Sequence, residues 1–145
     1  MVELSANAGD LETELAWFAG VLDARFQNYF HLEGASSADA LPTPPTFLDT
    51  TNAYARFLNQ LALSSEERLA LVLALVPHLR PRLLDVFHTR NTTFDRRFTE
   101  FGGIRSGSDG DFAPTGETLA FILGGDSLEA RLKVVLLLGP DGALA

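Results

Sequence analysis

An uninterrupted run of eight apolar residues, Leu69 to Val76, follows a helix-start signal, and this combination constrains the fold more than any other feature. Ser64 and Glu67 stand three residues apart in the capping-box pattern, in which each side chain binds the other residue's backbone N–H. A short apolar run could also be a buried strand, but the capping box and the Leu/Ala content favour a helix. We therefore predict a helix that is buried on all sides and that Pro77 kinks or ends.

A second apolar pattern lies near the N-terminus, where Asp10 can cap a helix. The apolar residues recur at helical spacing at Leu11, Leu15, Phe18, Leu22, Phe26 and Tyr29. The opposite face carries Glu12, Glu14, Asp23 and Arg25. An apolar stripe of this length must pack against another surface, so we predict a long amphipathic helix that is able to self-associate through the stripe.

Proline, alanine and serine dominate the next segment, which we interpret as a semi-rigid linker. The predicted organisation is an N-terminal helical arm at 1–32, a linker at 33–46, a compact domain at 47–139 and a tail at 140–145. Because the tail closely follows an apolar segment, we expect the chain to be a truncated part of a longer protein.

The compact domain is predicted to begin with three helices, the third starting at Pro81. Residues 91–101 alternate aromatic and polar side chains and predict a strand, and residues 106–111 predict a turn. Thr115 is expected to cap a helix that Gly124 and Gly125 stop, and Asp126 or Ser127 to cap the next turn.

Residues 134–138 read as a short apolar strand, and the phenylalanines of this half are predicted core residues: Phe94, Phe98, Phe101, Phe112 and Phe121. The fold class is therefore α+β and mostly helical. The order of elements predicts a winged-helix-like domain with a small β-hairpin, preceded by the long amphipathic helix.

Charge and composition exclude several classes of function. The net charge is −8, concentrated in residues 1–50, which carry eight acids and one arginine. The sole lysine, Lys133, follows no glycine loop of the Walker A type, so this chain is predicted not to be an enzyme. The histidines lack ligand spacing and there are no cysteines, so no metal or cofactor is expected in this chain. The cysteine-free composition and the N-terminus, which lacks a signal peptide, fit a cytoplasmic protein without a membrane anchor.

Arginines gather between residues 80 and 105, where they exceed the acids by three. Arginine suits paired contacts with carboxylates or phosphates. The candidate partner-binding residues are Arg90, Arg96, Arg97 and Arg105, although ordinary surface ion pairs would explain them as well. The overall negative charge argues against nucleic acid as a ligand.

Four segments resemble one known family: ERLALVLALVPHLRP at 67–81, RFTEFGG at 97–103, PTGET at 114–118 and FILGGD at 121–126. They look like the N-terminal, winged-helix-like region of bacterial AAA-family ATPases associated with extracellular contractile injection systems. The resemblance covers roughly residues 50–132. It implies that an ATPase core, with its ATP and Mg²⁺, lies further along a parent protein and outside this sequence.

The resemblance thus implies a non-catalytic docking or assembly domain that recognises a protein partner or its own ATPase core. The alternative is a winged-helix nucleic-acid-binding module, with Pro81–His88 as recognition helix and the arginines on the wing.

Overall fold

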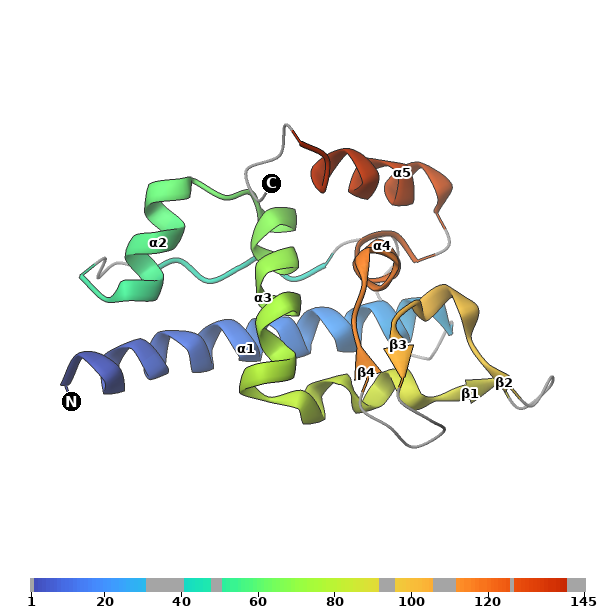
Figure 1. Ribbon diagram of the computed structural model, residues 1–145, viewed down its shortest axis with the longest axis horizontal. Helices are drawn as coiled ribbons and strands as arrows, with labels where there is room; N and C mark the ends of the chain where they lie inside the picture. Colours follow the sequence, from blue (N-terminus) through green and yellow to red (C-terminus); the bar gives the residue numbers. More distant parts are fainter. Residues whose placement is uncertain are drawn as a thin grey trace. The chain divides into compact units, whose positions relative to one another are not determined.

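The computed structural model describes residues 2–30, 41–47, 51–91, 96–105, 112–125 and 127–140, and it is mostly helical (Figure 1). The chain forms two compact units, Met1–Val72 and Leu73–Ala143. The boundary between them falls inside a helix and differs from the predicted linker at 33–46. The part of that linker at 33–40 and the tail beyond residue 140 lie outside the described residues.

Helix α1 (Val2–Tyr29) begins nine residues before the predicted first helical residue, Leu11. Asp10 is therefore not a cap; it lies inside the helix, where its carboxylate accepts a hydrogen bond of 3.0 Å from Asn52 Nδ2. Most of the predicted apolar stripe is confirmed, because Leu15, Phe18, Leu22 and Phe26 are buried. The predicted polar face is wrong at Glu14 and Arg25, both of which are buried.

Helix α2 (Ala53–Leu61) packs against α1. Asn7 of α1 accepts a hydrogen bond of 2.9 Å from the backbone N–H of Tyr54, at the start of α2. Such N–H groups have no partner within their own helix, so a side chain of α1 completes the first turn of α2. The two helices therefore form one unit, which does not fit the prediction of a separable N-terminal arm.

Helix α3 (Ser65–Leu79) starts with the predicted capping box. The N–H of Ser64 donates to Glu67 Oε1 at 3.0 Å, and the N–H of Glu67 donates to Ser64 Oγ at 3.2 Å. Pro77 lies inside the helix, which ends two residues later. The prediction that this helix is buried on all sides is wrong, since its buried residues share one face: Leu69, Val72, Leu73 and Val76. Ala74 is exposed, because neighbouring elements cover only one side of the helix.

The second unit continues with the 3₁₀ helix η1 (Pro81–His88) and two short antiparallel pairs. Strand β1 (Arg90–Asn91) pairs with β2 (Arg96–Arg97), and β3 (Ile104–Arg105) pairs with β4 (Phe112–Ala113). A 3₁₀ turn, η2 (Thr99–Phe101), lies between the pairs. The prediction of one strand over residues 91–101 is therefore wrong, because this segment contains β2 and η2. The predicted turn at 106–111 lies outside the described residues.

Helices α4 (Gly116–Gly124) and α5 (Leu128–Leu137) pack against each other (Figure 1). The predicted end of α4 at Gly124 and Gly125 is confirmed, and Ser127 Oγ caps α5 by accepting from the N–H of Ala130 at 3.4 Å. The predicted strand at 134–138 is wrong. This apolar segment continues the helix that Ser127 starts, and five residues were too short a window to show the helical period.

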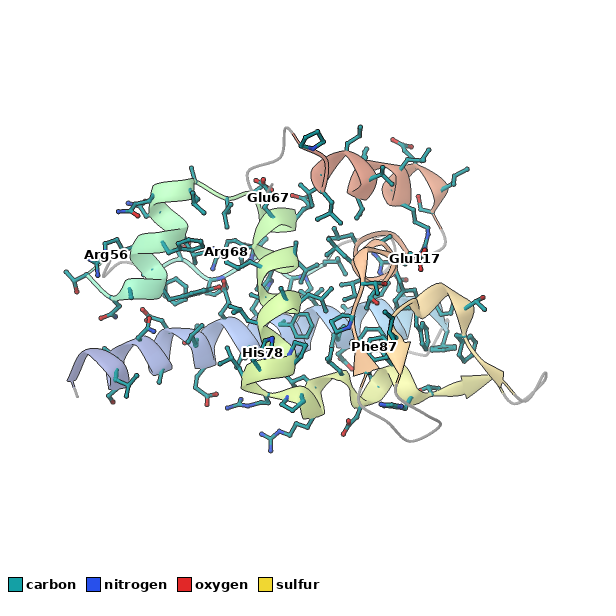
Figure 2. All side chains as sticks on the ribbon, in the orientation of Figure 1. Arg56, Glu67, Arg68, His78, Phe87 and Glu117 are labelled. Carbon is teal, nitrogen blue, oxygen red and sulfur yellow. The ribbon has the colours of Figure 1, made fainter. Side chains whose placement is uncertain are left out.

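Aromatic rings form the core of the second unit around Phe87, labelled in Figure 2. The rings of Phe87 and Phe112 are stacked with their centres 4.9 Å apart, and the ring centres of Phe101 and Phe121 are 4.8 Å apart. Burial of Phe101, Phe112 and Phe121 confirms three of the five predicted core phenylalanines. Phe98 is half-buried, and Phe94 lies outside the described residues. Among the described helices, none has the length and apolarity needed to span a membrane.

Candidate functional site

The first unit contains a buried charged cluster. The Glu14 side chain is 1% exposed and receives two hydrogen bonds from Arg68, at 2.5 Å and 3.2 Å. Tyr54 donates its hydroxyl to the same carboxylate at 2.5 Å. Burial first, and then the hydrogen bond to Glu14, raise the pKa of Tyr54 well above its usual value. The cluster links three helices through one carboxylate.

Aromatic rings and a proline-rich segment enclose the same arginine. The Arg68 guanidinium (labelled in Figure 2) lies 5.7 Å from the ring centres of Trp17 and Phe47, within cation–π range. It also donates to the carbonyl of Pro45 at 2.9 Å, and Trp17 Nε1 donates to the carbonyl of Pro42 at 2.9 Å. The charged groups of this cluster thus satisfy one another, and we assign it a structural role.

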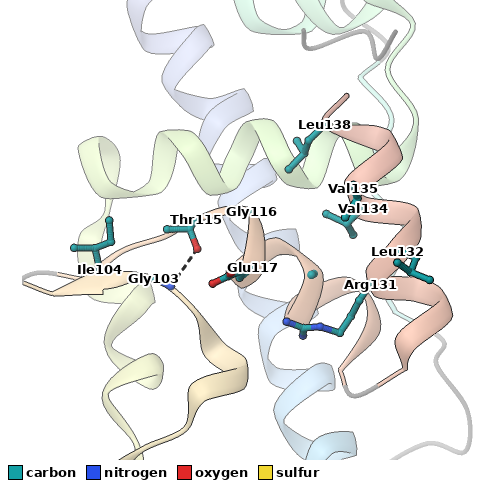
Figure 3. Close-up of a pocket in the computed structure, with 11 residues that line it drawn as sticks. Gly103, Ile104, Thr115, Gly116, Glu117, Arg131, Leu132, Val134, Val135 and Leu138 are labelled. Carbon is teal, nitrogen blue, oxygen red and sulfur yellow. Dashed lines mark hydrogen bonds between the residues drawn. The ribbon is translucent and has the colours of Figure 1, made fainter. Parts of the chain in front are cut away.

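The second unit contains a pocket of about 640 Å³ between α4, α5 and β3, which we call the α4/α5 pocket (Figure 3). Buried Ala120 and Val134 supply apolar surface deep in the pocket. The remaining lining residues lie towards solvent or in the surrounding turns: Gly103, Ile104, Thr115, Gly116, Glu117, Arg131, Leu132, Val135 and Leu138. The pocket is therefore mainly apolar with few polar groups.

Hydrogen bonds at the start of α4 fix one wall of the pocket. Thr115 Oγ1 accepts from the N–H of Gly103 at 3.2 Å (dashed in Figure 3), and Thr118 Oγ1 accepts from the N–H of Thr115 at 3.0 Å. Gly103 adopts φ +81°, and a Cβ there would collide with the ring of Phe112. The FGG and PTGET segments of the sequence thus meet at this wall.

Two opposite charges line the pocket, Glu117 and Arg131 (Figure 3). Arg131 Nη1 donates to the carbonyl of Gly125, beyond the end of α4, at 3.2 Å. Glu117 stands in the first turn of α4, at the other end of that helix. Within the described part of the chain, Glu117 has no hydrogen-bond or ion-pair partner and Arg131 has no carboxylate partner.

Helix α5 exposes most of its apolar side chains. Within Leu128–Leu137, Val134 alone is buried. We call the exposed set the α5 face: Leu128, Leu132, Val135, Leu136 and Leu138. Ile104 adds a further exposed apolar side chain at the α4/α5 pocket. Contiguous apolar surface of this kind commonly marks a site of protein interaction.

The predicted arginines fall on the two short antiparallel strand pairs. Register places Arg90 opposite Arg97 and Asn91 opposite Arg96 in the β1–β2 pair. In the β3–β4 pair it places Arg105 opposite Phe112. The backbone thus brings three of the four arginines together. Their side chains lie outside the described part of the structure.

The α5 face is not among the predicted sites, and self-association was expected through α1 instead. That proposal needs correction, since Leu15, Phe18, Leu22 and Phe26 are buried in the folded chain. The missed signal is the spacing of Leu128, Leu132 and Val135, which is helical once Ser127 is taken as the cap.

Among the described residues, no three His, Asp or Glu side chains lie close enough together to hold a metal ion. Comparison with protein families, with curated proteins and with solved structures found no match.

Proposed function

We propose that this chain is a non-catalytic docking or assembly domain of an AAA-family ATPase, of the group associated with extracellular contractile injection systems. In this proposal the domain is winged-helix-like and cytoplasmic. ATP and Mg²⁺ belong to a core that lies outside the sequence. The RFTEFGG, PTGET and FILGGD segments support the family assignment.

The α5 face is the observation that carries the docking role. Transferring apolar surface out of water is favourable by roughly 25 cal/mol per Å². A helix that buries one residue and exposes several leucines therefore gains stability when a folded protein covers it. The α4/α5 pocket beside it offers a recess for partner side chains.

The β1–β2 pair is the second candidate surface, because it carries Arg90, Arg96 and Arg97 within two paired strands. Arginine binds carboxylates with two parallel hydrogen bonds, so this surface would select an acidic partner. The proposal assigns affinity to the α5 face and selectivity to the arginines.

Site-specific photo-crosslinking in the producing cell tests the proposal. A photoreactive residue replaces Leu136 on α5 or Arg97 on β2, and the matched control replaces exposed Asn59 on α2. We expect a discrete protein adduct at position 136 and none at position 59. Equal or absent adducts at the two positions would refute the docking role.

A further inference from the structure

Three leucines of α5 form a single ridge. Leu128, Leu132 and Leu136 stand at i, i+4 and i+8 and are 72%, 58% and 78% exposed. Side chains four residues apart line up along a helix, and such ridges pack into the grooves of a second helix. This ridge is symmetric about Leu132, so an antiparallel copy of it would set Leu128 against Leu136.

The charges beside the ridge are also self-complementary. Each chain presents one carboxylate at Glu117 and one guanidinium at Arg131, both on the α4/α5 pocket. In an interface with two-fold symmetry, every contact occurs twice: if one residue of the first copy contacts another residue of the second copy, the same two positions are also in contact with the copies exchanged. Two copies can therefore satisfy both groups at once by forming two equivalent ion pairs.

The overall charge limits where two copies can meet. Each chain carries a net charge of −8, so most of its surface repels a second copy. The charges of the described residues near α5 sum to zero. The negative charge of Glu117 cancels the positive charge of Arg131, and Lys133 forms an ion pair of 3.3 Å with Glu129 on α5. Apolar side chains surrounded by balanced charge make this the surface on which association costs least.

We propose that the α5 face and the α4/α5 pocket bind a second copy of this chain across a two-fold axis near Leu132. In this dimer Glu117 of each copy faces Arg131 of the other. The inference deepens the proposed function and rests on it, since it names the partner that the α5 face docks.

Sedimentation equilibrium of the full chain over a range of concentrations tests the apolar part. We expect a reversible monomer–dimer equilibrium, which Leu132→Ser shifts to monomer by about tenfold or more in dissociation constant. Phe57→Ser, at an exposed apolar position on α2, is the matched control and should leave the dissociation constant unchanged. Circular dichroism verifies that both variants are folded.

Charge exchange tests the pairing. Glu117→Arg and Arg131→Glu should each weaken the dimer by about tenfold or more, because like charges then face each other twice. An equimolar mixture of the two variants restores opposite charges in both pairs, as does the double variant, so both should dimerise again. Asp85→Arg, an exposed charge reversal on η1, is the control.

Distinct results overturn the inference and the proposed function. A chain that stays monomeric at every concentration, or a dimer insensitive to Leu132→Ser and to charge exchange, overturns the inference. If position 136 then crosslinks a different protein, the docking role stands with another occupant. A dimer that obeys the charge exchange in solution but gives no adduct in cells supports the inference and counts against the proposed function.

Discussion

Replacing Arg68 by methionine should destabilise the first unit by about 3–5 kcal/mol, the cost of leaving a buried carboxylate without its partner. Glu14 is almost fully buried and accepts two hydrogen bonds from Arg68. Methionine preserves much of the side-chain volume but removes both bonds and the cation–π contacts with Trp17 and Phe47. Among the described residues, Tyr54 alone would remain to donate a hydrogen bond to the carboxylate.

Urea unfolding followed by tryptophan fluorescence measures this loss directly. Trp17 is the sole tryptophan of the chain and lies beside Arg68, so its emission reports on the first unit. With a slope of about 2 kcal/mol per molar urea, the expected loss lowers the midpoint by about 1.5–2.5 M. The control is Arg56→Met on α2 of the same unit, which removes one exposed hydrogen bond of 3.3 Å to the carbonyl of Thr51 and should cost about 0.5 kcal/mol or less.

A double-mutant cycle decides whether the loss comes from the pair itself. Glu14→Gln removes the buried charge, so adding Arg68→Met to it should cost much less than Arg68→Met alone. Additive effects, or a loss below about 1 kcal/mol for Arg68→Met, would refute the reasoning that Glu14 depends on Arg68 for its burial.

Three further predictions follow from local geometry. Burial raises the pKa of Tyr54 in the folded chain, so as the pH rises above 10.0 this tyrosine loses its proton in the unfolded chain before it does in the folded one. The free energy of unfolding should therefore fall by up to about 1.4 kcal/mol for each pH unit above 10.0. Tyr54→Phe should flatten this decline in urea titrations near pH 9 and 11. Gly103→Ala should lower the free energy of unfolding by about 2 kcal/mol or more, because φ at Gly103 is +81° and the new Cβ would collide with the ring of Phe112. Gly9→Ala is the control. Its Cβ would meet no neighbouring atom, so this substitution should raise the free energy of unfolding by about 0.5–1 kcal/mol. Ser127→Ala removes the cap of α5 and should lower the free energy of unfolding by about 1 kcal/mol. Calorimetry would measure this loss.

Local signals in the sequence were sufficient to predict three helix termini, namely the start of α3, the start of α5 and the end of α4. The Ser64–Glu67 capping box, the cap at Ser127 and the glycine stop after α4 each depend on residues within three or four positions of one another. Hydrogen bonds of this range form whatever the rest of the chain does, so a pattern of residues suffices to find them. The buried face of α1 follows from periodicity in the same way.

The candidate docking site was less accessible to sequence reasoning. The arginines were visible as a cluster, and register does place Arg90 beside Arg97. The α5 face was not found, because residues 134–138 alone do not distinguish a strand from a helix. Whether an apolar residue is core or exposed depends on which element lies over it, and no local pattern contains that information.

Tertiary structure alone decided the fate of Glu14 and of α5. A carboxylate on a helix belongs in water unless a partner compensates its burial, and the partner here, Arg68, is 54 residues away in the chain. Leucines on a helix belong in a core unless no element covers them, and only the packing of α4 against α5 left Leu128, Leu132 and Leu136 exposed. The sequence determined where α3 and α5 begin and where α4 ends through short-range hydrogen bonds, while burial depends on contacts between residues far apart in the chain.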